Sequence, residues 1–234
     1  MRSALRRRWF EHELARTTLA PAPGKLEDIG TPYGGWTLPV EAIGEGWTCY
    51  CVGAGGDIAF DIELVRRFRA RVRTVEAVAA MVREAEQQAA GLAGLTVHHA
   101  AIATRDGPIR MQRSHDPQSR SVSAAHLYEG EQYVELPGMT LTSLMDSLGD
   151  ERIDLLKLDI EGGEYEVLPS LDLTGLGVRI LSTQLHHVGG VARASGLIKQ
   201  LKDRGYVPVA CRPVVKLTFV RGELLGPARQ PARR

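Results

Sequence analysis

Short apolar runs alternate with segments of helical periodicity along most of the chain. The apolar runs predict buried strands at 47–52, 72–77, 95–103, 153–159 and 178–185. Apolar residues at helical spacing predict helices between them, at 58–68, 78–90, 141–148, 163–168 and 191–205. This alternation is typical of an α/β fold, in which a doubly wound, mostly parallel sheet carries helices on both faces.

The chain closes with two strand-like runs, at 206–211 and 214–220, that only Arg212 and Pro213 separate. So short a connection has no room for a crossover helix, and we therefore expect a C-terminal antiparallel hairpin at the end of the sheet. Ligands of such sheets bind at the carboxyl ends of the parallel strands.

The segments around this pattern differ in composition. Residues 1–20 predict a helix with a basic start and a weak apolar stripe, which we expect to be solvated and loosely packed. Residues 21–46 are rich in Pro and Gly and predict a loop, and residues 104–138 are polar and irregular. The expected divisions are an N-terminal helix and lid segment (1–46), a main domain (47–223) and a flexible tail (224–234).

Composition and charge exclude several classes of protein. The chain has 234 residues, 44% of them hydrophobic, which is enough for one domain with a buried core. A formal net charge of +1 argues against a general nucleic-acid binder, and no apolar run is long enough for a membrane span. The N-terminus has no apolar signal stretch, and the three cysteines form neither a disulfide framework nor a zinc site. We expect a cytoplasmic protein.

The first candidate site is Gly53-Ala54-Gly55-Gly56-Asp57, which follows a predicted strand and opens a helix. Glycines there let the backbone turn sharply and let a ligand approach closely. Glu76 ends the next strand about 20 residues further on, where a carboxylate can accept both hydroxyls of an adenosine ribose. The glycines alone also fit a tight turn without a ligand, but with Glu76 they favour a nucleotide-like cofactor.

Two cofactors compete for this turn. NAD usually requires a third glycine, and Ile58 stands at that position, which weighs against an NAD-linked reductase. S-adenosylmethionine has no phosphate, and it needs only the close-approach turn, the ribose acid and polar groups near its amino-acid end.

The second candidate site is the pair Asp159 and Glu161, which follows the fourth predicted strand beside two glycines. Carboxylates there can bind the ammonium of the cofactor, favour its sulfonium or hold a cation. The alternative is that they cap a helix start, where acids are favoured. Glu164 and Glu166 are expected to be exposed helix residues.

The third candidate is the pair His186 and His187, at the end of the fifth predicted strand. Neighbouring residues of a strand point to opposite faces, so only one of the two can easily face the crevice. A histidine there is suited to take a proton from a hydroxyl. With the acids it could also bind a divalent metal, but the spacing does not require one, and the question stays open.

Four segments together resemble the FkbM-type methyltransferases: PYGGWTLP (32–39), CVGAGGDIAFDIEL (51–64), IDLLKLDIEGGEYEVL (153–168) and QLHH (184–187). The similarity runs from about residue 32 to residue 220. The resemblance implies a class I methyltransferase fold, Rossmann-like, with a seven-stranded sheet whose last strand is antiparallel. It also implies S-adenosylmethionine as the cofactor and S-adenosylhomocysteine as its product.

The resemblance implies a set of cofactor-binding residues. Gly53, Ala54 and Gly55 would form the turn, Glu76 would hold the ribose, and Asp159 would face the methionine part and the reacting centre. The positions beside the ribose and adenine would be Ala77, Ala101 and Ile102.

The chain departs from the family pattern at one position of the first motif. Cys51 stands where an acid is common two residues before the first glycine. Asp57 or Asp61 would substitute for that acid.

These features predict an O-methyltransferase that acts on a hydroxyl of a natural product or sugar. The base would be His186 or His187, with Asp159 as the alternative. Substrate and lid residues would be Tyr33, Trp36 and Glu161, and for Tyr33 and Trp36 the alternative is packing against the sheet edge. A non-catalytic cofactor-binding protein of the same fold is the competing function. We expect a small-molecule acceptor, no nucleic acid and no membrane as partners, and the basic N-terminal helix offers a surface for a homodimer.

Overall fold

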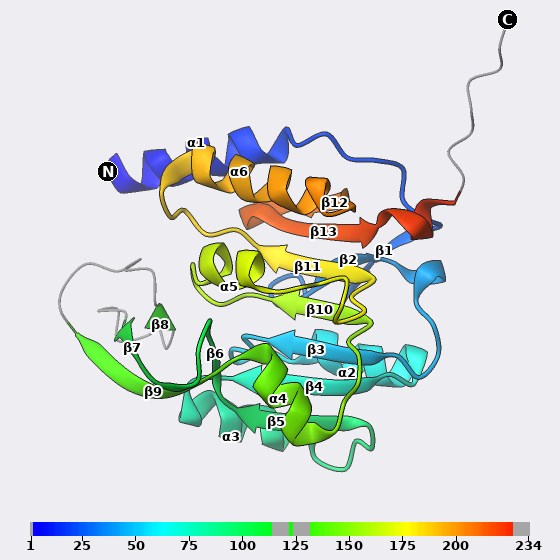
Figure 1. Cartoon of the computed structure of the whole chain (residues 1–234), viewed down its shortest axis with the longest axis vertical. Coiled ribbons are helices and arrows are strands. Elements are labelled where there is room, and N and C mark those ends of the chain that lie inside the picture. The colour runs from blue at the N-terminus through cyan, green and yellow to red at the C-terminus, as the bar shows by residue number, and fades with distance from the viewer. Residues whose placement is uncertain (1, 114–121, 124–131, 227–234) are drawn as a thin grey trace, which may run out of the picture.

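A computed structural model describes residues 2–113, 122–123 and 132–226, which centre on a seven-stranded sheet in the order β12-β13-β11-β10-β3-β4-β5 (Figure 1). Neighbouring strands of its central part run parallel: β3 (Thr48–Val52), β4 (Arg71–Glu76), β5 (Leu95–His99), β10 (Leu155–Leu158) and β11 (Ile180–Gln184). The predicted α/β fold with a doubly wound, mostly parallel sheet is confirmed.

The sheet ends in the predicted hairpin, formed by β12 (Tyr206–Arg212) and β13 (Lys216–Arg221). The strand β13 runs antiparallel to both β11 and β12, and the two hairpin strands are joined by the short 3-10 helix η2 (Pro213–Val215). The short connection enforces this reversal, because a parallel pair needs a crossover of a dozen or more residues.

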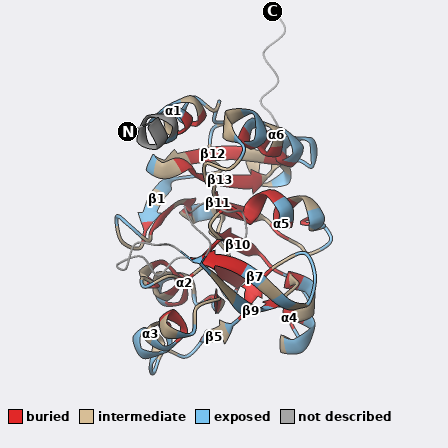
Figure 2. Cartoon of the chain, turned by 90° about the vertical axis from the view of Figure 1, so that its left-hand side faces the viewer, coloured by how far each residue is buried: buried red, intermediate tan, exposed pale blue. Residues whose placement is uncertain are grey.

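Helices cover both faces of the sheet. Tyr50 and Val52 of β3 pack in one core with residues of α1 (Arg2–Ala15), α4 (Leu141–Leu148), α5 (Glu164–Ser170) and α6 (Gly190–Asp203). Cys49 and Cys51 of the same strand pack in the opposite core, with α2 (Ala59–Phe68) and α3 (Ala79–Ala89). The period of two along a strand separates the two cores, and Figure 2 shows the buried strands between the partly exposed helices. None of the described helices is long and apolar enough to cross a membrane.

The N-terminal helix α1 is anchored in the core, which corrects the expectation of a solvated, loosely packed helix. Phe10 and Leu14, one helical turn apart, are buried in the same core as α6. Trp9 is 57% exposed. The expected apolar stripe consisted of Leu5, Trp9 and Leu14, whereas the helix packs through Phe10 and Leu14.

Residues 21–46 contain an antiparallel hairpin where a loop was predicted. The strands β1 (Leu26–Ile29) and β2 (Trp36–Pro39) pair, and the 3-10 helix η1 (Val40–Ala42) follows. Trp36 and Leu38 are buried, and the carbonyl of Thr37 accepts a hydrogen bond of 2.8 Å from Thr218 Oγ1 of β13. The strands are short and flanked by Pro and Gly, so tertiary packing outweighs the local turn signals.

A second sheet replaces the irregular segment predicted at 104–138. The run 95–103 breaks at Ala100, and β6 (Ala101–Ile102) leaves the main sheet to pair with β9 (Tyr133–Met139). The order of this sheet is β6-β9-β7-β8, with β7 (Gly107–Arg113) and β8 (Val122–Ser123). The two longer strands, β7 and β9, are partly exposed along most of their length, so they lack the apolar runs that reveal buried strands. In Figure 1, β7 and β8 lie beyond the carboxyl ends of β10 and β3.

The C-terminal tail is described only in part. The 3-10 helix η3 (Gly222–Leu225) follows β13, and the rest of the predicted tail, 227–234, lies outside the described residues.

Candidate active site

The glycine turn connects β3 to α2 at the carboxyl edge of the sheet. Gly53 has a φ of 81°, and a Cβ at this position would overlap the backbone carbonyl oxygen of Asp159. Gly55 has a φ of 60°, and a Cβ there would meet no atom within 4 Å. The turn is therefore closed against β10 on one side and open at Gly55, where a ligand can approach the backbone.

Glu76, at the end of β4, holds this turn. Its Oε2 accepts a hydrogen bond of 2.9 Å from the backbone N–H of Gly55, and its Oε1 accepts one of 2.8 Å from Val78. The residue is 6% exposed. The carboxylate thus lies at the glycine turn, where the ribose prediction requires it; the ribose contact itself stays a prediction.

Asp57 and Asp61 lie on either side of the start of α2. Asp57 accepts hydrogen bonds from the N–H of Ala59 (3.0 Å) and from Thr31 Oγ1, so it ties the helix start to the segment after β1. Asp61 is buried beside β4, and its Oδ2 accepts a bond of 2.6 Å from Thr74. Burial raises the pKa of Asp61 to about 6, although the Lys157 ammonium and the Thr74 hydroxyl act in the opposite direction. Asp61 is therefore bound within the core rather than at the open side of the turn.

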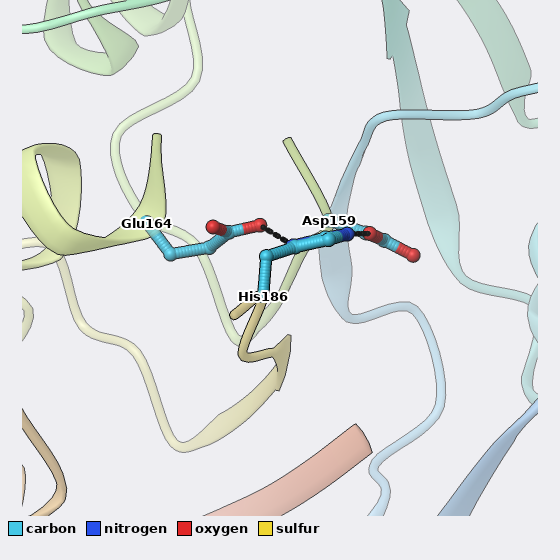
Figure 3. A group of neighbouring side chains, drawn as sticks. All are labelled: Asp159, Glu164 and His186. Carbon is cyan, nitrogen blue, oxygen red and sulfur yellow. Dashed lines mark hydrogen bonds and ion pairs between the residues drawn. The ribbon is translucent and has the colours of Figure 1, made fainter. Parts of the chain in front are cut away.

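Acids and one histidine gather beside the glycine turn, at the ends of β10 and β11 (Figure 3). Nε2 of His186 lies 3.7 Å from Oδ1 of Asp159 and 3.3 Å from Oε2 of Glu161. Nδ1 of the same ring lies 3.1 Å from Oε1 of Glu164. The ring of His187 lies elsewhere and makes an edge contact with Phe10, 5.0 Å between centroids. The structure thus brings His186, and not His187, to the predicted acids.

The charge of this cluster alters His186. Burial alone would lower the pKa of the imidazole, but the Glu164 carboxylate, with Asp159 and Glu161, outweighs it and raises the pKa to about 9. Perturbed titratable groups next to charge partners are typical of functional sites, and also of structural ion-pair networks. One donor atom from each of Asp159, Glu164 and His186 lies within 4.8 Å of the other two, an arrangement that could hold a metal ion.

Glu164 is the site residue that the sequence analysis misplaced. It was expected to be an exposed helix residue, but its side chain is 0% exposed. Oε1 accepts hydrogen bonds from the backbone N–H of Ile160 (2.8 Å) and from His186. A Glu in the first turn of a helix often reaches back to a backbone N–H just before it, and this signal could have indicated the inward position.

The second sheet touches the site at Glu161. This residue has a φ of 52°, the left-handed region, and its backbone carbonyl accepts a hydrogen bond from Ser123 Oγ of β8. The second sheet thereby contacts the turn that carries the acids.

Of the two predicted lid residues, only Tyr33 projects into solvent. Tyr33 is 85% exposed, whereas Trp36 is 1% exposed and packs within β2. Lys216 of β13 joins them: its Nζ donates to the carbonyl of Tyr33 (2.7 Å) and lies 4.9 Å from the Trp36 ring centroid. Burial lowers the pKa of Lys216, and the charge of Asp159 opposes this shift. Trp36 therefore fits the alternative of packing at the sheet edge, and Lys216 is a neighbour of the site that the sequence analysis did not single out.

The remaining predicted positions, Ala77, Ala101 and Ile102, follow the ends of β4 and β5 along the chain. The carbonyl of Ala77 accepts a bond of 3.0 Å from His99 Nε2. Ala101 and Ile102 are buried in β6, directly after the main sheet. Their role beside the adenine stays a prediction.

Comparison with known proteins decides the family. The model of the methyltransferase FkbM domain matches residues 28–208. The chain belongs to the FkbM methyltransferase family. As an FkbM methyltransferase it is a methyl-transferring enzyme that depends on S-adenosylmethionine, and the matched span contains the glycine turn, the acids and both histidines.

Solved structures resemble this FkbM methyltransferase only remotely. One is a precorrin-6y C5,15-methyltransferase from Geobacter metallireducens, at 12% identity and a TM-score of 0.48, covering 78% of this chain and 84% of that one. Another is a SAM-dependent methyltransferase from Aquifex aeolicus, at 13% identity and a TM-score of 0.40, covering 77% and 84%. No curated protein matches the chain by sequence.

Proposed function

We propose that this FkbM methyltransferase transfers a methyl group to a hydroxyl oxygen of a small molecule, a natural product or a sugar. The observation that carries the proposal is the close approach of Gly53 to the backbone of Asp159. It joins the glycine turn to the acid–histidine cluster at one edge of the sheet. A cofactor on the turn and an acceptor on the cluster would then be neighbours, and holding reactants together is a large part of catalysis.

The residues at the turn fit the cofactor. S-adenosylmethionine, when bound, supplies a methyl group carried by a positively charged sulfur. The open side of Gly55 leaves room for a ligand, and each oxygen of the Glu76 carboxylate has lone-pair capacity beyond its one backbone hydrogen bond. The negative charge of Asp159 favours a cation in front of it. Ala54 at the turn, with Ala77, Ala101 and Ile102, would flank the nucleoside.

Asp159 is the residue best placed to take the proton of the acceptor hydroxyl. Its side chain is 21% exposed, against 11% for His186. His186 lies beside it, with Nε2 3.7 Å from Oδ1 of Asp159, and can orient the carboxylate. A base in this position contributes roughly 10²–10⁴ in rate. Glu161 and Tyr33 would contact the acceptor at the rim.

The first experiment measures binding and turnover separately. Calorimetry with S-adenosylmethionine tests the cofactor site, and transfer of labelled methyl groups to a panel of hydroxylated small molecules, with amines for comparison, tests the reaction. Asp159→Ala should lose at least about 100-fold in rate while the fold is kept, and the exposed Glu166→Ala should keep the rate. Full activity of Asp159→Ala would refute the role of Asp159.

The alternative, a non-catalytic protein that binds the cofactor, predicts a different pair of results. The protein would bind S-adenosylmethionine in the calorimeter and label no acceptor. Labelling of amines but not of hydroxyls would replace O-methylation by N-methylation.

A further inference from the structure

Three carboxylates of the candidate active site, those of Asp159, Glu161 and Glu164, lie within 4 Å of the His186 ring. Asp159 and Glu164 both form their ion pair with His186, through opposite nitrogens of its ring. The nearby ammonium groups are directed to carbonyl oxygens instead: Lys157 donates to Gly53 and Lys216 to Tyr33. Among the residues that the structure describes, carboxylates therefore outnumber positive groups at the centre of the cluster.

Glu164 adds a second observation that is independent of this charge count. Its side chain is 0% exposed, and Oε2 has no hydrogen-bond partner among the described residues. Buried carboxylate oxygens rarely stay without a partner, because water is not available to replace it. Figure 3 shows the carboxyl group of Glu164 turned toward the ring of His186.

We propose that Asp159, Glu164 and His186 form a binding site for one divalent cation, in which Asp159 and Nε2 of His186 are the ligands and Glu164 orients the histidine ring. Their donor atoms already lie within 4.8 Å of one another, and they come from the ends of two adjacent parallel strands and the first turn of α5. One imidazole with carboxylates is a donor set that suits Mn²⁺ and similar transition metal ions. Nε2 faces Asp159, and Glu164 holds the Nδ1 side of the ring, an arrangement in which a carboxylate orients a metal-binding histidine.

The catalytic use of this cation depends on the proposed function. A divalent cation at Asp159 would attract the oxygen of an acceptor hydroxyl and lower the pKa of that hydroxyl. The second oxygen of Asp159 would then accept the proton. The competing occupant of the same negative site is the cationic amino-acid end of the cofactor itself, and the test has to separate the two.

The test measures Mn²⁺ binding to the full chain without cofactor or acceptor, by the loss of the free Mn²⁺ signal in electron paramagnetic resonance. We expect one ion per chain for the wild type. Asp159→Asn should abolish binding, and Glu164→Gln should weaken it about 10–100-fold, the usual effect of an orienting carboxylate. Glu166→Gln, an exposed acid two residues away on α5, is the matched control and should bind like the wild type. Circular dichroism and thermal unfolding of each variant check the fold.

Each outcome decides between the two proposals. Absence of saturable Mn²⁺ binding up to about 1 mM, or equal binding by Asp159→Asn and Glu166→Gln, overturns the cation site. If methyl transfer then proceeds unchanged in the presence of a chelator, the proposed function stands without the metal. If one Mn²⁺ binds as expected but no acceptor is labelled, the cation site stands and the proposed methylation fails.

Discussion

The buried carboxyl of Asp61 leads to a quantitative prediction for stability against pH. The residue is 3% exposed in the first turn of α2, and Thr74 Oγ1 of β4 donates a hydrogen bond of 2.6 Å to its carboxylate. Burial raises its pKa from 3.8 to about 6. Replacing it with Asn removes the titration and keeps an oxygen that can accept the Thr74 hydrogen bond.

The size and sign of the effect follow from this shift. A folded-state pKa about 2 units above the unfolded value corresponds to about 3 kcal/mol, at about 1.4 kcal/mol per unit. The folded chain holds the proton more tightly than the unfolded chain. The protonated Asp61 carboxyl therefore makes its full contribution to the free energy of unfolding below pH 3.8. This contribution is lost as the pH rises to about 6, and it stays lost at higher pH. The free energy of unfolding of the Asp61→Asn variant should not fall in this way as the pH rises.

Urea unfolding at a series of pH values from about 4 to 8 measures the free energy of unfolding of both proteins. The difference between Asp61→Asn and wild type should grow by about 3 kcal/mol in favour of the variant across that range. Glu166→Gln, which removes an exposed acid, serves as the control and should follow the wild type. A difference that does not change with pH would show that the Asp61 carboxyl is not desolvated as the structure has it.

Three further predictions concern the site. Gly53→Ala should prevent stable folding because its Cβ would overlap the Asp159 backbone. Gly55→Ala has open space around its Cβ and should cost only about 1 kcal/mol of stability for its positive φ. Equal decreases of the Tm of the two variants in thermal unfolding would contradict this. Glu76→Gln should weaken S-adenosylmethionine binding at least about tenfold in calorimetry, and an unchanged Kd would remove Glu76 from the cofactor site. His186→Ala should lower the methyl-transfer rate by about 10²-fold or more. His187→Ala should keep the rate and lower the Tm, because the His187 ring packs against α1. The opposite pattern in a rate assay would make His187, and not His186, the active-site histidine.

The order of elements in the main sheet was predictable because its strands are buried on both faces. The run 47–52, for example, is apolar at five of its six positions, as is typical of a strand that is buried on both faces. The helix at 141–148 was predicted to the residue. Thr140 before it accepts from the N–H of Ser143, and Gly149 after it takes a left-handed conformation, so both ends are marked locally.

The elements that were missed are those with little burial or short length. The hairpin β1–β2 has strands of four residues among Pro and Gly, and only packing against the sheet reveals Trp36 and Leu38 as core residues. The strands β7 and β9 are half-exposed and read as polar loop. In such segments the pairing partner, and not the local pattern, decides the structure.

By itself, the sequence determined the α/β fold, the glycine turn after β3 and the carboxylates at the ends of β4 and β10, because each depends on residues that are close together along the chain. The tertiary structure alone decided that His186 faces the acids while His187 packs on α1, and that Glu164 points inward. The physical reason is that the direction of a side chain at a strand end or in a first helical turn depends on which distant elements pack around it. The spacing of residues along the sequence does not show which distant elements pack around a given side chain.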